Sequence, residues 1–381
     1  MELRSSFAQT RKVNGEILQT RFKNTVGPWK SGRFMPLSQR AFSANCYALS
    51  KIWFKCSVVN LRVQDLNFFS SQIKSWLYQD LLIKPSELVL FRSTDNGGLG
   101  LINVGIRSLA LLIRTFLETS VNPLFRHSLF HEHLFRYHVM DETSLPDPGF
   151  TPFYDRAFFQ LITYYKSSST MNIATMTTKQ WYTLLLEDKI LFSQATEDSP
   201  AALLPIRTEI MNPNTDWSQV WMIARTKGLG PELISFQIKM LHNLLPTQER
   251  IARLGLNHDQ PRLCLLCRLE SEDLVHSFFD CSKNMLVGLA LLGCVQQILP
   301  DLSPQAAVLL DFGCILPVEE NLALQCILAT GMKYIWEARL AKKVVYKFKM
   351  RAEIEARISI LRKTRYQSSA SLMAELIRML V

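Results

Sequence analysis

The sequence lacks the long apolar run that a membrane-spanning helix requires. Its longest such run, residues 285–295, falls well short of the roughly 20 residues needed to cross a bilayer, and Gln296 and Gln297 end it. The N-terminus carries scattered Arg and Lys without an apolar signal core, and Glu2 and Glu16 count against a transit peptide. We therefore expect no membrane span and no secretion, which leaves an intracellular location, in the nucleus or the cytoplasm.

Phosphate-binding loops are also missing. The stretch 95–100, Asp-Asn-Gly-Gly-Leu-Gly, contains the dipeptides of a tight turn. Asn103 stands where a dinucleotide-binding loop would have its third glycine, and no Gly-Lys-Ser/Thr follows. The sequence also has no internal repeat and no low-complexity tract. We expect a turn at 95–100 rather than a nucleotide site.

Cysteines are sparse, with 8 in 381 residues. Without a signal peptide they are better explained as reduced thiols or metal ligands than as a disulfide framework. Apolar residues make up 48% of the chain and charged residues 20%, so it carries enough hydrophobic surface to fold. A chain of this length predicts two or three globular units.

The net charge of +10 is concentrated at the two ends of the chain. Residues 1–75 carry twelve Lys and Arg against three acids, a balance of +9, and residues 333–365 carry eleven against three, a balance of +8. Residues 76–332 are net negative by 7. Basic ends attract phosphate backbones or anionic membrane surfaces, although the same charges can serve solubility alone.

Helical periodicity dominates wherever a period is visible. From residue 37 to 56, apolar residues recur at spacings of three and four: Leu37, Ala41, Ala44, Ala48, Ile52 and Cys56. A second face of that helix carries Arg40, Tyr47, Lys51 and Lys55, which could meet a nucleic acid or only solvent. Further helices are expected at 63–82, 109–117 and 231–245, and Thr247 is the expected N-cap of a short helix that ends at Gly255.

Two other stretches predict loops rather than sites. Prolines among Ser, Asp and Asn predict connections at 144–153 and 198–216, where domain boundaries should fall. Four histidines lie close together, but their spacing differs from the two-histidine helix motif of zinc proteases, and we assign them no ligand role: His127, His131, His133 and His138.

The most informative pattern combines three cysteines with one histidine. Cys264 and Cys267 are separated by two residues, and His276 and Cys281 follow after eight and four more. Four such donors close a tetrahedron around zinc, which leaves no open position for water, so the predicted site is structural. A redox dithiol would use only the first pair and would leave the other two donors unexplained.

The order of these residues resembles the zinc-binding segment at the C-terminus of LINE-type (non-LTR) retrotransposon reverse transcriptases. Around the zinc ligands the resemblance rests on Glu272 and Phe278, and on either side of them on Trp217, Phe236, Lys239, 241–242, 244–247, Arg250, 334–337 and Arg339. Further upstream, 38–40, 49–53 and 97–101 resemble the thumb and connection that follow the polymerase palm. The eight residues between Cys267 and His276 differ from the four of retroviral knuckles.

The resemblance implies a mainly α-helical fold with several helical subdomains and a small Cys3His zinc-binding segment. It implies a basic thumb-like region at 1–85, a connection at 86–150, a linker-rich region at 151–215, a zinc-binding domain at 216–300 and a basic helical region at 301–381. Reverse transcriptases catalyse with paired aspartates, and the sequence contains no Asp-Asp pair. We therefore expect a non-catalytic remnant that lacks the endonuclease, fingers and palm.

Three other functions remain open. A magnesium-dependent nuclease would use Pro300-Asp301 with Asp311 or 319–320, but the lysine that would complete such a centre is not in place. A protein-interaction scaffold would dock along a helix at about 320–363, through an apolar stripe of Leu340, Val344 and Phe348. The chain could also be a decayed element with no selected role.

The expected partner is RNA or single-stranded or hybrid nucleic acid, bound without sequence preference, with structural zinc as the cofactor and an undetermined oligomeric state. The expected metal ligands are Cys264, Cys267, His276 and Cys281. Cations that would neutralise phosphates lie on three stretches: Arg40, Lys51 and Lys55; Arg250 and Arg253; and Arg339, Lys343, Lys347 and Arg351.

Overall fold

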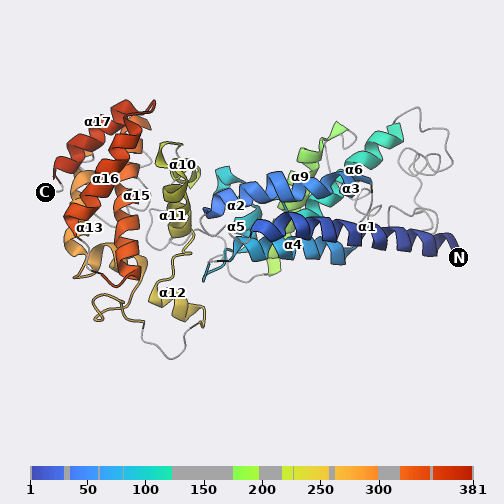
Figure 1. Ribbon diagram of the computed structural model, residues 1–381, viewed down its shortest axis with the longest axis horizontal. Helices are drawn as coiled ribbons and strands as arrows, with labels where there is room; N and C mark the ends of the chain where they lie inside the picture. Colours follow the sequence, from blue (N-terminus) through green and yellow to red (C-terminus); the bar gives the residue numbers. More distant parts are fainter. Residues whose placement is uncertain are drawn as a thin grey trace. The chain divides into compact units, whose positions relative to one another are not determined.

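The computed structural model describes residues 2–29, 35–58, 61–79, 81–121, 175–196, 217–225, 227–256, 262–298, 318–343 and 346–379. These residues fold almost entirely as helices, which confirms the expected mainly α-helical class (Figure 1). Within them there is no strand, and Leu263 and Ser271 form an isolated antiparallel bridge. The chain divides into two compact units, the first made of Met1–Met35, Arg40–Gln79 and Leu101–Pro200, the second of Pro36–Gln39, Asp80–Gly100 and Ala201–Val381.

The first unit is a bundle of long helices. Its described elements are α1 (Glu2–Val26), most of α2 (Leu37–Ser43), the π-helical segment η2 (Ala44–Leu49), α3 (Ser50–Val58), α4 (Val63–Leu77), α6 (Val104–Val121) and α9 (Thr178–Thr196). Helix α1 packs against α4, and α6 packs against both α3 and α9 (Figure 1).

The second unit contains shorter helices around one core. Its described elements are α5 (Glu87–Phe91), η3 (Thr94–Asn96), α10 (Trp217–Ile223), η6 (Lys227–Leu229), α11 (Pro231–Leu241), α12 (Gln248–Arg253), η7 (His276–Asp280), α13 (Met285–Ile298), α15 (Val318–Leu340), α16 (Lys347–Leu361), α17 (Gln367–Leu376) and η8 (Ile377–Met379). Helix α15 packs against α11, α13, α16 and α17, so it lies at the centre of this unit.

The apolar stripe expected at 37–56 is buried throughout. All six of its side chains, from Leu37 to Cys56, are at most 2% exposed. The backbone turns wider at η2, where the helix takes up the π-helical form, before the α-helix resumes at Ser50. The wider turn keeps the later members of the stripe on the buried side, although they follow one another at spacings of four.

The contact between α1 and α4 combines apolar packing with one buried carboxylate. The rings of Phe22 and Phe69 meet edge to face, with centroids 5.0 Å apart. Asp65 is buried between the helices, where Arg62 donates to it at 2.9 Å and Gln19 at 2.7 Å. A Cβ on Gly15 would come within 2.6 Å of the Asp65 carboxylate, so the absence of a side chain there permits the close approach.

The C-terminal region departs from the single helix expected at about 320–363. The chain leaves α15 at Leu340, turns through Lys342 in the left-handed conformation, and starts α16 at Lys347. The supposed apolar stripe does not form, because Leu340 and Phe348 are both exposed. The reversal is favoured because it lets α16 bury its own stripe against α15: Met350, Ile354, Ile358 and Leu361. Residues 322–336 of α15 are largely buried and so provide no free docking surface.

The glycine-rich stretch forms the expected turn. Gly97 and Gly100 have φ of 80° and 65°, and the Gly98 amide donates to the Ser93 carbonyl at 2.8 Å. Within the second unit the turn packs on Trp221 and His242, whose rings stack 4.7 Å apart. The His242 ring also contacts the Gly97 carbonyl at 2.6 Å. A Cβ on Gly97 would lie 2.2 Å from the Trp221 ring, so this position requires glycine for both conformation and space.

Other expectations concern helix ends and regions that the structure leaves out. Thr247 is the N-cap of α12, since its side chain accepts from the Arg250 amide, and Gly255 follows the helix with φ of 65°. Helix α11 ends earlier than expected, at Leu241, because Asn243 turns left-handed. No helix among the described residues is long and apolar enough to span a membrane. The four histidines at 127–138, the loops at 144–153 and 198–216, and the acids Asp301 and Asp311 lie outside the described residues.

Candidate metal centre

Cys264 and Cys267 lie on a tight turn that follows the bridge between Leu263 and Ser271. The Cys264 amide donates to the Glu270 carbonyl at 2.8 Å, and the Arg268 amide donates to the Cys264 carbonyl at 3.0 Å. Arg268 has a φ of 58°, which reverses the chain directly after the second cysteine. The Leu266 amide also points at the Cys264 sulfur, 3.4 Å away. The turn therefore directs both sulfurs to one point and places a backbone donor beside one of them.

His276 and Cys281 come from the two ends of η7. The Asp273 carboxylate accepts from the His276 amide at 2.7 Å, and the Cys281 amide donates to the His276 carbonyl at 2.9 Å. Phe278, between the two ligands, is fully buried and packs near Trp336 with ring centroids 6.2 Å apart. The segment is thus fixed by the core on one side, while its two donors face the turn that carries Cys264 and Cys267.

The four donor atoms lie within 4.8 Å of one another. The Cys264 and Cys281 sulfurs are 3.8 Å apart, and the Cys267 sulfur is 3.3 Å from His276 Nε2. Tetrahedral zinc with Zn–S bonds of about 2.3 Å places its sulfur ligands about 3.8 Å apart. The donor set and its spacing therefore fit zinc. All four residues expected from the sequence come together. A redox dithiol would need only Cys264 and Cys267, so it does not account for His276 and Cys281.

A carboxylate supports the histidine from behind. Glu270 Oε2 lies 3.0 Å from His276 Nδ1, the ring nitrogen that does not face the sulfurs. Such a carboxylate fixes the tautomer and orientation of a ligand histidine, so that Nε2 presents its lone pair to the ion. Sequence reasoning missed Glu270. Its position within the loop, between two pairs of ligands, was the available signal.

The three thiols of the site differ in pKa. Burial raises the pKa of Cys264 to about 12 and also raises that of Cys281. Burial acts in the same direction on Cys267, but hydrogen bonds with the Leu269 and Glu270 amides and with the His276 and Cys264 side chains together outweigh it and lower its pKa to about 7. A bound divalent ion favours the thiolate at every ligand, so an ion held by these four donors would stabilise the folded segment.

Glu272 connects the metal-binding loop to the core of the second unit. Its carboxylate accepts from the amides of Gln248 and Leu265 at 3.0 and 3.2 Å, and from Arg339 Nε at 2.8 Å. These bonds outweigh the effect of burial and lower the pKa of Glu272. Arg339 also donates to the Pro246 carbonyl at 3.1 Å and lies over the Trp336 ring at 4.3 Å.

This contact corrects the prediction that Arg339 binds phosphate. Its side chain is 1% exposed, and its guanidinium is held by Glu272 inside the protein. Arg40 requires the same correction, since it is 3% exposed. Its guanidinium donates to the carbonyls of Met35 and Leu77 at 2.8 and 3.0 Å, which satisfies the C-terminal end of α4. The helical spacing groups Arg40 and Arg339 with exposed cations. It cannot show that both side chains bind buried acceptors in the folded chain.

The other expected cations keep a surface position to different degrees. Lys51 and Lys343 are exposed, and Lys55 and Lys347 are partly exposed. Arg253 and Arg351 form ion pairs one turn along their helices, with Glu249 and Glu355 respectively. Arg250 is half-buried, and burial lowers its pKa. These residues lie on several elements: Lys51 and Lys55 on α3 of the first unit, and in the second unit Arg250 and Arg253 on α12, Lys343 before α16, and Lys347 and Arg351 on α16.

The sequence of residues 206–286 matches the family model described as zinc-binding in reverse transcriptase. The match covers about a fifth of the chain and contains all four donors of the metal centre. No curated protein matches the sequence. Residues 206–286 are therefore similar to the zinc-binding segment of reverse transcriptases, as the sequence pattern indicated, and they contain a Cys3His group that could hold a metal ion.

Proposed function

We propose that this chain is the C-terminal part of a LINE-type reverse transcriptase and binds RNA or single-stranded or hybrid nucleic acid without sequence preference. Zinc would act structurally, and a reducing compartment, the nucleus or the cytoplasm, suits its thiolate ligands. One observation carries the proposal most directly, namely the combination of exposed rings and unpaired cations at the turn between α15 and α16.

This basic turn consists of Lys342, Lys343, Tyr346, Lys347, Phe348 and Lys349. Tyr346 and Phe348 are 51% and 66% exposed, and their ring centroids are 5.7 Å apart. The Lys349 ammonium lies over the Tyr346 ring at 5.7 Å. Among the described residues, Lys342, Lys343 and Lys347 make no ion pair. Rings that accept bases beside cations that attract phosphates are the pattern by which proteins bind single strands without reading sequence.

The first unit offers a second basic surface. Lys51 and Lys55 are one turn apart on α3 and have no carboxylate partner among the described residues. Tyr47 and Phe54, on η2 and α3, are 62% and 76% exposed. The same chemistry therefore recurs on both units, in agreement with the excess of positive charge at the two ends of the sequence.

The test measures affinity for unstructured RNA and single-stranded DNA as a function of salt. Four to six phosphate contacts predict a log-log slope of about −3 to −4, at about −0.7 per phosphate. The double variant Lys51→Ala/Lys55→Ala should weaken binding to all sequences alike, since phosphate contacts carry no sequence information. Binding that ignores both salt and these substitutions would contradict the proposal.

The chain by itself should not extend a primer. Two-metal polymerases hold their ions with closely placed carboxylates, and the sequence has no adjacent Asp pair. A primer-template assay with magnesium and deoxynucleotides should give no extension above a protein-free control. Incubation of a plasmid with the chain and magnesium tests the nuclease alternative in the same buffer, and the plasmid should stay intact.

A further inference from the structure

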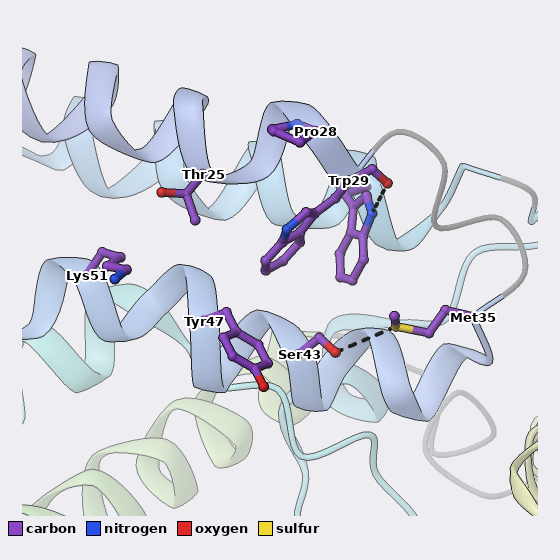
Figure 2. Close-up of a pocket in the computed structure, with 8 residues that line it drawn as sticks. Thr25, Pro28, Trp29, Met35, Ser43, Tyr47 and Lys51 are labelled. Atoms are coloured by element: carbon purple, nitrogen blue, oxygen red, sulfur yellow. Dashed lines mark hydrogen bonds between the residues drawn. The ribbon is translucent and has the colours of Figure 1, made fainter.

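A pocket of about 510 Å³ opens in the first unit between the C-terminal end of α1 and the helix formed by α2, η2 and α3 (Figure 2). Thr25 and Trp29 extend from the α1 side, and Lys51 extends from α3, into the space between them (Figure 2). The remaining lining residues are Pro28, Met35, Ser43, Tyr47 and Trp76. The volume lies in the usual range of small-molecule pockets, about 300–1,000 Å³.

Three aromatic rings form much of its wall. The indoles of Trp29 and Trp76 lie 4.9 Å apart at an angle of 54°, and Trp76 Nε1 donates to the Trp29 carbonyl at 2.9 Å. Trp76 is only 4% exposed, so this part of the wall is fixed by the packing of α4. Tyr47, by contrast, is largely exposed and lies one turn before Lys51. The wall is therefore preformed on the indole side and accessible on the tyrosine side.

Aromatic walls can accept cationic, apolar or anionic ring-containing ligands, and the positive charge of Lys51 determines which of these fits the pocket. No carboxylate lines it, and the Lys51 ammonium has no acidic partner among the described residues. Aromatic cages attract cations, but here a cationic ligand would meet the charge of Lys51. A purely apolar ligand would make no use of the exposed Lys51 ammonium, which attracts anions. The lining thus favours a flat ring that carries an anionic group.

Besides Lys51 and the aromatic residues, the polar side chains in the described lining are those of Thr25 and Ser43. The Thr25 hydroxyl donates to the Arg21 carbonyl at 3.0 Å, and the Ser43 hydroxyl lies 3.6 Å from the Met35 sulfur. Neither hydroxyl is placed to recognise a particular pattern of hydrogen-bond donors and acceptors on a ligand ring. One turn beyond the pocket lie two further cations, Arg21 on α1 and Lys55 on α3. Phosphates that continue from the pocket past Thr25 and Lys51 would therefore meet positive charge (Figure 2).

We propose that this pocket holds one unpaired nucleotide of a bound single strand, with its base against Trp29, Tyr47 and Trp76 and its phosphate at Lys51. The assignment rests on the proposed function, and it adds a specific place where a base leaves solvent. A base held in a duplex could not enter, so the pocket distinguishes unpaired from paired positions of a strand. Because stacking is available to every base, the pocket confers little sequence preference.

The experiment compares two single strands of equal length on the full chain, one with bases throughout and one with abasic sites at its centre. Both carry the same number of phosphates, so the difference in affinity isolates base binding. The chain should bind the base-containing strand about tenfold more tightly, since stacking of one base on aromatic side chains supports a loss of this size. Tyr47→Ala should remove most of the difference, and Tyr47→Phe should restore it.

Phe42→Ala serves as the matched control, because Phe42 on α2 is an exposed ring on the same stretch of helix but outside the lining. It should leave the preference for bases unchanged. Placement is read directly by irradiating a strand that contains 5-iodouracil, which crosslinks to nearby aromatic residues. The modified peptide should contain Trp29, Tyr47 or Trp76.

The outcomes separate this inference from the proposed function. If both strands bind equally and with strong salt dependence, nucleic-acid binding stands and the pocket assignment is overturned. If neither strand binds, the proposed function fails and the assignment fails with it. A free mononucleotide should compete poorly, because it lacks the neighbouring phosphates. Competition as strong as that of the whole strand would overturn the assignment to a strand.

Discussion

The carboxylate of Glu272 and the guanidinium of Arg339 form a buried ion pair between the metal-binding loop and α15. Glu272 is fully buried and Arg339 nearly so, and Arg339 Nε lies 2.8 Å from Glu272 Oε1. Because the amides of Gln248 and Leu265 and the Pro246 carbonyl join the same network, the pair ties the loop to the start of α12 as well as to α15.

Breaking this pair should be strongly destabilising. Glu272→Met or Arg339→Met alone leaves a buried charge without a partner and should lower the free energy of unfolding by about 3–5 kcal/mol. The double substitution removes both charges and should cost much less than the sum of the single ones. Urea unfolding of all four proteins measures the coupling, and strictly additive losses would show that the two residues do not act as a pair.

One zinc ion per chain should bind tightly, and its removal should loosen residues 231–300 before the rest of the chain. Structural zinc sites contribute roughly 10 kcal/mol or more to folding of their segment, so chelation should increase hydrogen exchange there before elsewhere. Cys281→Ser should lower the zinc content measured by native mass spectrometry, whereas the exposed Cys46→Ser should not. A metal-free protein whose stability ignores both the chelator and Cys281→Ser would rule out the metal centre.

The basic turn should account for part of the salt dependence. Replacing Lys342, Lys343 and Lys347 with Ala should reduce the slope of log affinity against log salt by about 2, at about 0.7 per phosphate. A triple variant at the other end of α16, Arg362→Ala/Lys363→Ala/Arg365→Ala, removes the same charge. Equal effects of the two triples on the slope would show that net charge, rather than this turn, determines the binding.

Stability should fall between about pH 6.5 and pH 4 because of His242. Burial lowers the pKa of His242 to about 4, and the neighbouring Arg225 and Arg92 act in the same direction. The unfolded chain binds a proton near pH 6.5 and the folded chain does not, so stability is full above 6.5 and is lost as the pH falls. The loss amounts to about 3 kcal/mol at most. His242→Gln should reduce the difference between the urea midpoints measured above pH 6.5 and below pH 4.

Adding a side chain to the glycine turn should destabilise the second unit. The Cβ of Gly97→Ala would adopt a left-handed φ and meet the Trp221 ring, so we expect a loss of about 1–3 kcal/mol. Gly27→Ala provides the control, since nothing lies within 4 Å of its Cβ. Thermal unfolding compares the two, and an unchanged melting temperature for Gly97→Ala would contradict the packing described for this turn.

Local patterns in the sequence determined most of the helices, the tight turn at Gly97, the cap at Thr247 and the four metal donors. Each depends on spacing or on the conformational limits of one residue, and both can be read along the chain. The ligands are recognisable because soft donors must occur in a short segment to surround one ion.

The tertiary structure alone decided which cations are free. Arg40 and Lys51 occur on the same expected helix face, yet Arg40 satisfies the carbonyls of Met35 and Leu77 while Lys51 stays exposed at a pocket. Arg339 and Lys343 differ in the same way. Arg339 is buried because Glu272, from a distant segment, requires a partner, whereas Lys343 stays exposed. The break after α15 and the pocket beside Trp29 arise in the same way. These features depend on which elements pack together. A buried polar group without a hydrogen-bond partner is costly, so it binds the partner that the packing places beside it.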